Sequence, residues 1–185
     1  MKSKYSYCPF CGKGLVDKQI EGHDYRACPD DQSCGYVHWD NPLPVAVAII
    51  ARRHRVLLVK RKFNPRAGFW CLPGGFVNRM EVPRQGGTRE TWEETRLRVL
   101  LSRLPIAIVR PEGVNENISF FRAMAVEGEP QLCEETLDFG WFSEDDLPEL
   151  AFGSHGEQLE AWFKRPSVRA WRALAKAAKF VGIEL

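Results

Sequence analysis

The stretch 75–94 reads GFVNRMEVPRQGGTRETWEE, and it decides the fold expected for the whole chain. Pro83 suits the first turn of a helix, because the N–H that proline lacks needs no partner there. Further along, three glutamates fall at i, i+3 and i+4, and therefore share one face of the helix. They are Glu90, Glu93 and Glu94. We predict a helix over 83–96 that carries clustered negative charge.

Like charges at this spacing repel and destabilise a helix by a few tenths of a kcal/mol per pair. A chain tolerates such repulsion where a cation lies between the carboxylates, and hard oxygen ligands favour Mg²⁺ or Mn²⁺. Gly74 and Gly75 would let a backbone carbonyl approach the same cation, because they carry no side chain. Arg89 precedes Glu90 and can orient a carboxylate or contact a phosphate. The segment therefore predicts a site for a divalent cation and an anionic substrate.

Six residues fit the pattern G-x5-E-x7-R-E-x-x-E-E, which chance produces on the order of 10⁻⁷ times per window. They are Gly75, Glu81, Arg89, Glu90, Glu93 and Glu94. This pattern resembles the box of the Nudix hydrolase family. The resemblance implies an α+β Nudix fold, with mixed β-sheets and flanking helices in an α/β/α sandwich.

Two positions depart from the family box. Thr91 replaces an aliphatic residue, and Arg96 replaces the glycine that ends the helix with a positive φ. We expect Arg96 to cost about 1 kcal/mol or to shift the end of the helix. Neither position is a ligand in the family, so the departures concern the helix and not the chemistry.

The resemblance also implies an activity, which is hydrolysis of a nucleoside diphosphate linked to another moiety. Water would attack a phosphorus atom, assisted by divalent cations on Glu90, Glu93 and Glu94. Glu81 would support the site through an ion pair or an outer-sphere water. The family often takes a further glutamate from a loop beyond the box, as base or ligand. Glu135 is the favoured candidate, and the alternatives are Glu112, Glu116 and Glu134.

Four of the six cysteines lie in the first 34 residues, in a C-x2-C pair and a C-x5-C pair. These are Cys8, Cys11, Cys28 and Cys34, and a glycine follows each pair. Two thiolate pairs supply the tetrahedral soft ligands that Zn²⁺ prefers, so we expect a structural zinc ribbon over 1–40. His23 or His38 is the alternative to one of the four. Cys71 and Cys133 are isolated in apolar surroundings, and we expect both to be small buried residues.

A ribbon ahead of such a domain resembles two groups within the family. The NADH pyrophosphatase group carries the array S-Q-P-W-P-F-P-x-S after the box, and residues 97–117 contain nothing like it. The other is a bacterial zinc-ribbon group linked to cleavage of ADP-ribose or flavin dinucleotide. The expected substrate is therefore a small nucleotide, with ADP-ribose or a dinucleotide such as FAD or NADH favoured. A nucleotide-sensing or nucleic-acid-binding module that uses the ribbon is the alternative, and the intact carboxylate set favours the enzyme.

The rest of the sequence narrows the protein class. The 185 residues contain 26 Lys and Arg against 24 Asp and Glu, a formal charge of +2. This balance gives no reason to expect a nucleic-acid partner. The longest apolar run, 45–51, is far shorter than the roughly 20 residues of a membrane helix. The start has no apolar core of a signal peptide, so we expect a cytoplasmic protein without a membrane partner.

Hydrophobic periodicity predicts the remaining elements. Strands are expected over 43–51, 56–60, 69–72, 99–109, 118–126 and 139–142. A loop over 153–156 should precede a helix near 157–163, which closes a catalytic domain over 41–165. A helical extension over 166–185 follows, capped by Ser167. Its apolar face comprises Val168, Trp171, Leu174, Ala175, Ala178 and Val181. We expect this face to dock on the domain's own surface, and a homodimer contact is the alternative.

Overall fold

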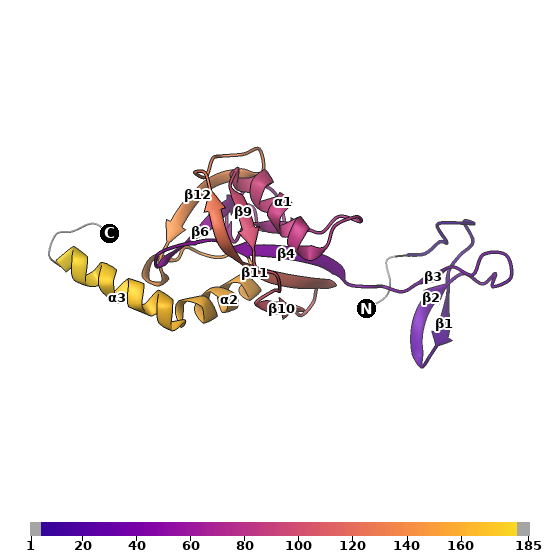
Figure 1. Ribbon diagram of the computed structural model, residues 1–185. Helices are drawn as coiled ribbons and strands as arrows, with labels where there is room; N and C mark the ends of the chain where they lie inside the picture. The colour runs from indigo at the N-terminus through magenta and orange to yellow at the C-terminus, as the bar shows by residue number, and fades with distance from the viewer. Residues whose placement is uncertain (1–4, 181–185) are drawn as a thin grey trace. The chain divides into compact units, whose positions relative to one another are not determined.

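The structure is a computed structural model that describes residues 5–180. Val181 and the rest of the predicted tail therefore lie outside the described residues. The chain divides into two compact units, Met1–Pro42 and Leu43–Leu185, and Figure 1 labels most of their elements.

The first unit is a small three-stranded antiparallel sheet in the order β1-β2-β3. Its strands are β1 (Val16–Ile20), β2 (His23–Ala27) and β3 (Val37–His38). Cys8, Leu15 and Cys28 form its buried cluster, with Tyr36 packed against them. A unit of about this size rarely folds on such a core without a disulfide or a metal.

The second unit contains two sheets. The first has the order β10-β11-β4-β8, and β9 pairs with the far end of β11. β4 and β11 run parallel, whereas the other pairs are antiparallel. The strands are β4 (Leu43–Ile49), β8 (Gly74–Phe76), β9 (Arg98–Leu101), β10 (Ala107–Val109) and β11 (Glu116–Glu127).

The second sheet has the order β12-β6-β5, and β7 also pairs with β6. Its strands are β5 (Ala51–Arg52), β6 (Arg55–Arg61), β7 (Trp70–Cys71) and β12 (Thr136–Phe142). The helices of this unit are α1 (Pro83–Thr95), the 3₁₀ turn η1 (Glu144–Asp146), α2 (Gly153–Phe163) and α3 (Pro166–Phe180).

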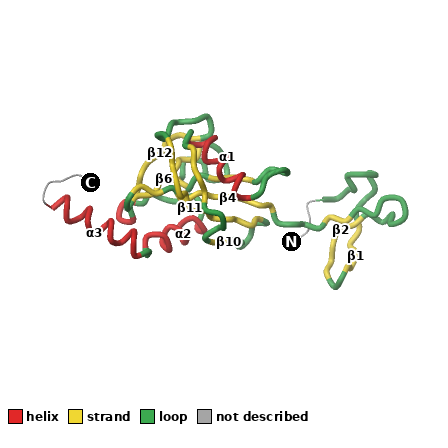
Figure 2. The backbone as a smooth tube through the Cα atoms, in the orientation of Figure 1, coloured by secondary structure: helices red, strands yellow, loops and turns green. Residues whose placement is uncertain are grey.

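Helices cover the first sheet on both faces, as the red segments of Figure 2 show. Alternate residues of β4 face opposite sides. Ala46 and Ala48 belong to the cluster on the α1 side, whereas Val47 and Ile49 pack in the cluster that contains the apolar face of α2. The predicted α+β class is therefore confirmed, and α1 and α2 pack against opposite faces of β4.

α1 approaches the sheet closely where Gly86 and Gly87 lie. A Cβ atom on Gly87 would stand 3.0 Å from the Leu101 Cδ1 and 3.3 Å from the Ala46 Cβ. A larger residue at Gly87 would push the helix away from β4 and β9, whereas one at Gly86 would meet Val77 and Glu81 of the segment before the helix. Gly87, which weakens the helix intrinsically, thus sets its distance from the strands.

The two departures from the family box have local explanations. Thr91 is fully buried, and its hydroxyl donates to the Gly87 carbonyl at 2.8 Å, so no polar group is left unpaired. Arg96 adopts the left-handed conformation with φ of 59°, and its N–H donates to the Trp92 carbonyl at 2.8 Å. The helix ends where a glycine would end it, so the expected shift does not occur.

Two predicted elements were wrong. The strand expected over 99–109 is two strands, because β9 pairs with Ala123–Glu127 whereas β10 pairs with Ile118–Phe120. The chain must turn between them to reach different parts of β11. The loop expected over 153–156 is the first turn of α2, where burial of His155 outweighs the low helix propensity of two glycines.

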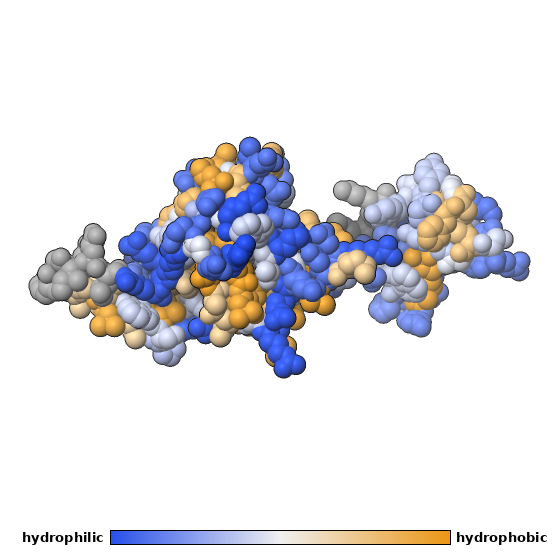
Figure 3. All heavy atoms as spheres, turned by 45° about the horizontal axis from the view of Figure 1, so that its top comes forward, coloured by the Kyte–Doolittle hydropathy of each residue, from blue (hydrophilic) through white to orange (hydrophobic). Residues whose placement is uncertain are grey.

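α3 docks on its own unit only in part. Val168 and Ala178 are buried, but Trp171 is 44% and Leu174 is 55% exposed. Hydrophobic residues accordingly appear along α3 at the left of Figure 3. The charged face of the helix also contacts the domain, because Arg172 pairs with Glu144 and Asp145 of η1.

Candidate active site

Arg89 is the centre of a network of carboxylates on α1 and the segment before it. Its Nε donates to the Glu81 Oε1 at 2.7 Å, and its Nη1 donates to Glu90 at 2.7 Å and to Glu93 at 2.8 Å. Nη2 donates to the Phe76 carbonyl at 2.9 Å. The hydrogen bond from Arg89 lowers the pKa of Glu81. One guanidinium therefore offsets the repulsion that the sequence predicted on this helix face.

Glu94 lies deeper than the other glutamates. Its side chain is almost fully buried, and its Oε2 accepts a hydrogen bond of 2.9 Å from the Gly74 N–H. Burial raises the pKa of Glu94 to about 8, and it also raises the pKa of Glu90. A Cβ on Gly75 would stand 2.6 Å from the Glu90 carboxyl carbon, so Gly75 leaves the room that this carboxylate occupies.

These groups open on a cavity of about 580 Å³. All six box residues except Glu81 line it, namely Gly75, Arg89, Glu90, Glu93 and Glu94, and Gly74 lines it too. Of the four candidates beyond the box, Glu116 at the start of β11 and Glu135 just before β12 line the cavity. Glu112 and Glu134 do not. The sheets thus bring together carboxylates that are far apart in the sequence.

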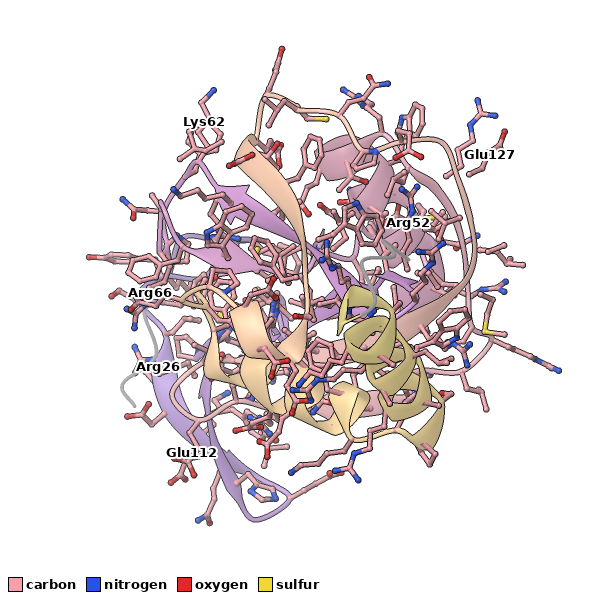
Figure 4. All side chains as sticks on the ribbon, turned by 90° about the vertical axis from the view of Figure 1, so that its left-hand side faces the viewer. Arg26, Arg52, Lys62, Arg66, Glu112 and Glu127 are labelled. Carbon is pink, nitrogen blue, oxygen red and sulfur yellow. The ribbon has the colours of Figure 1, made fainter. Side chains whose placement is uncertain are left out.

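Two further residues of the cavity escaped the sequence analysis. Arg61, the last residue of β6, donates through Nε to the Pro65 carbonyl at 2.9 Å, and its guanidinium lies 5.1 Å from the centre of the Phe152 ring. The sequence feature that could have indicated Arg61 was its position at the end of a buried strand. The neighbouring Lys62 points outward into solvent, as Figure 4 shows. His155 gave no signal, because its segment was predicted as a loop.

The donor set fits a divalent cation, since carboxylate oxygens are hard ligands and two of the carboxylates are shielded from water. The glutamates are nevertheless held apart by Arg89 and by the Gly74 N–H. Within residues 5–180, only the four N-terminal cysteines bring three or more possible ligand atoms within 4.8 Å of one another. A cation on α1 would therefore compete with Arg89 for Glu90 and Glu93.

The four cysteine sulfurs Cys8, Cys11, Cys28 and Cys34 form that second site, in the first unit. Cys8 and Cys34 are 3.5 Å apart, as are Cys11 and Cys28. None is in a disulfide, and these spacings fit a tetrahedral ion with S ligands at about 2.3 Å. The histidine alternatives are not part of the set, and the His38 Nε2 lies 3.6 Å from Asp40.

The two remaining cysteines differ in burial. Cys71 is buried as predicted. Cys133 is not, because it lies on the partly exposed loop before β12, where its sulfur donates to the Gln131 carbonyl at 3.4 Å.

Comparison with known proteins agrees with this geometry. The NUDIX domain family model matches residues 41–163. An ADP-ribose pyrophosphatase of Methanocaldococcus jannaschii is 32% identical over 121 residues, 63% of this chain and 69% of that protein. An NAD-capped RNA hydrolase, NudC, of Haemophilus influenzae is 33% identical over 150 residues. That alignment covers 76% of this chain, which spans about half the length of the NudC relative, 54%.

A NUDIX hydrolase from Nitrosomonas europaea has the same fold over nearly the whole chain. The TM-score is 0.77 at 28% identity, and the match covers 88% of this chain and 92% of that one. The chain belongs to the Nudix family, and it is a Nudix hydrolase. Among the described residues, no helix is long and apolar enough to span a membrane.

Proposed function

We propose that the protein hydrolyses the diphosphate of a nucleoside diphosphate linked to another moiety, in a reaction that requires Mg²⁺ or Mn²⁺. The observation that carries this proposal is the cavity itself, which gathers Glu90, Glu93 and Glu94 of α1, Glu135 and the cation Arg61. Negative groups on one side suit a metal, and the guanidinium of Arg61 suits a phosphate.

The three glutamates of α1 would hold the divalent cation, with Glu90 and Glu94 as the principal ligands. When bound, the cation supplies activation of water and neutralisation of the charge on the diphosphate. Glu81 keeps Arg89 in position through two hydrogen bonds, 2.7 and 3.0 Å long. Arg89 in turn orients the carboxylates of Glu90 and Glu93. The Gly74 N–H holds one oxygen of Glu94, and the other oxygen would be available to a cation.

Glu135 is the group that we propose as the base, because it enters the cavity from the sheet opposite α1. Its backbone carbonyl accepts from the Lys62 N–H at 3.2 Å, which anchors the loop before β12 to the end of β6. Glu116 is the alternative, since it reaches the cavity from β11.

ADP-ribose and dinucleotides such as FAD or NADH are the substrates we favour. The cavity volume lies within the range of small-molecule sites, and the curated relative from M. jannaschii is named an ADP-ribose pyrophosphatase. The missing array after the box weighs against NADH.

A substrate panel with Mg²⁺ or Mn²⁺ tests the proposal: ADP-ribose, NADH, FAD, diadenosine polyphosphates and nucleoside triphosphates. We expect Glu94→Gln to lower kcat by at least about 100-fold while leaving the circular-dichroism spectrum unchanged. Glu112→Gln is the matched control, because Glu112 is exposed and lies outside the cavity. Equal inertness of the wild type and Glu94→Gln on every compound would reject the enzyme, and the sensing alternative would stand.

The base is tested by a neighbouring pair of variants. We expect Glu135→Gln to lower kcat by about 100-fold, whereas Glu134→Gln should leave kcat unchanged. If Glu135→Gln behaves like Glu134→Gln and Glu116→Gln lowers kcat instead, Glu116 is the base.

We also propose that the cysteine cluster holds one structural Zn²⁺ in a ribbon over 1–40. The sulfur spacings support this assignment, and so does the small core that the unit otherwise has. Metal analysis of the protein purified without added metal should give one zinc per chain. A value near zero would refute the ribbon.

A further inference from the structure

His155 is the side chain of the cavity that the proposed reaction leaves without a role. It lies in the first turn of α2 with 5% of its surface exposed. The rings of Phe120 and Phe152 flank it, with centroids 5.6 and 5.1 Å away. These rings fix the plane of the imidazole, so its two nitrogens point in set directions.

The backbone determines which nitrogen carries the proton. The Leu72 N–H donates to the His155 Nδ1 at 3.2 Å, so this nitrogen is an acceptor. A neutral imidazole then carries its proton on Nε2. Burial, together with the charge of Arg61, lowers the pKa of His155 to about 3, so the neutral form persists at physiological pH.

His155 lines the cavity, and the surroundings of its Nε2 indicate where that atom points. Within residues 5–180, the buried side-chain polar atoms that lack a partner are the His54 Nδ1 and the Trp162 Nε1, and the His155 Nε2 is not among them. The described residues show no hydrogen bond from it either. The Nε2–H of His155 is therefore neither enclosed by protein atoms nor hydrogen-bonded within the part of the chain that the structure describes. We take it to point into the cavity that His155 lines.

The surroundings define the chemistry of the acceptor. Leu72 lies two residues before Gly74, whose N–H holds Glu94, so His155 and the metal-binding carboxylate flank the same short segment. Arg61 shares this side of the cavity. A fixed neutral donor beside a guanidinium suits an anionic oxygen, because hydrogen bonds to charged acceptors are about twice as strong as neutral ones.

We propose that the His155 Nε2–H donates a hydrogen bond to a diphosphate oxygen of the substrate. This inference rests on the proposed function and adds a binding residue to it. His155 has two separable tasks: Nδ1 supports the Leu72 backbone, and Nε2 holds the substrate.

Two substitutions separate these tasks. In His155→Asn the amide oxygen can still accept from the Leu72 N–H, but nothing reaches the position of Nε2. In His155→Gln the amide N–H₂ reaches that position, but the bond to Leu72 is lost. Thermal melts establish that each variant folds, and a lower melting temperature is expected for His155→Gln.

We expect His155→Asn to raise KM for the best substrate of the panel at least about tenfold, and His155→Gln to stay within about threefold of the wild type. A merely structural histidine predicts the reverse order, with His155→Asn close to wild type and His155→Gln impaired. The reverse order would overturn the proposal.

Calorimetry with ADP and adenosine, in the presence of Mg²⁺, locates the acceptor without requiring turnover. We expect His155→Asn to weaken ADP binding about tenfold and to leave adenosine binding unchanged. Equal losses for both compounds would place the contact on the nucleoside and overturn the assignment to the diphosphate. Calorimetry measures binding directly, so its result is independent of the substrate panel. Failure of the substrate panel would instead reject the proposed hydrolytic activity.

Discussion

At the residue scale, the adjacent glycines Gly74 and Gly75 make room for different groups. Gly74 has φ of 153°, and a Cβ there would stand 2.4 Å from the Ala46 carbonyl oxygen and 2.7 Å from the Val47 Cα. The neighbouring strand cannot yield, because both contacts are backbone. At Gly75 the three atoms nearest to the same Cβ all belong to the carboxyl group of Glu90, which can rotate away.

The two alanine variants should therefore fail in different ways. We expect Gly74→Ala to lower the free energy of unfolding by about 3 kcal/mol or more, since it combines backbone overlap with a disfavoured φ. Gly75→Ala should cost about 1 kcal/mol or less yet displace Glu90 and lower kcat at least about tenfold. Urea unfolding and steady-state kinetics measure the two effects. Gly113→Ala is a control for positive φ alone, because nothing lies within 4 Å of its added Cβ.

At the scale of the element, α1 and α2 differ in how far sequence could predict them. α1 carries its chemistry in its own spacing, so its bounds and its charged face were both foreseeable. α2 begins at Gly153 and contains Gly156, residues that locally oppose a helix. Its first turn forms because His155 contacts Leu72, 83 residues earlier. Nothing local encodes that contact, so neither the turn nor the site residue could be predicted.

Burial of the same histidine makes the stability of the protein depend on pH. The pKa of His155 falls from about 6.5 in the unfolded chain to about 3 in the fold. The unfolded state therefore binds more protons between these values, and stability is lost as pH falls from about 6.5 towards 3. From pH 7 to pH 5 we expect His155 alone to reduce the free energy of unfolding by about 2 kcal/mol.

Urea titrations of the wild type and His155→Asn at pH 7 and pH 5 measure this loss. The acid-induced loss should be about 2 kcal/mol smaller in the variant, because asparagine does not titrate. An identical loss in both proteins would show that other groups cause the acid sensitivity.

At the scale of the whole molecule, the two units differ in what stabilises them. Leu43–Leu185 has two large apolar clusters on the two faces of a sheet, whereas Met1–Pro42 has a few residues around four sulfurs. The cysteine spacing predicted this set, and the α+β fold was implied by the resemblance of the six-residue box to the Nudix family. The strand pairing of β9 and β10 with β11 could not be predicted, because it depends on where the chain turns between them.

Removal of the zinc that we propose for the cysteine cluster should act on one unit alone. We expect a chelator to increase the exchange rate of the amide hydrogens of β1 and β2 at least about 100-fold, while the amide hydrogens of β4 and β11 stay protected. Hydrogen exchange read by mass spectrometry measures both units in one sample. Cys28→Ser should reproduce the chelator's effect, and Cys133→Ser should not. Loss of protection in β4 as well would show that the units do not fold independently.

The pairing of β4 with β11 and of β6 with β12 also constrains when the protein can assemble during synthesis. Each pair joins segments roughly 70 to 80 residues apart, as the registers Val45↔Ile118 and Val59↔Phe139 show. All the carboxylates of α1 leave the ribosome before either partner strand does. The cysteine unit, by contrast, is complete once Pro42 has emerged. During translation the N-terminal unit should therefore be complete first, and the cavity only after α2 has been made.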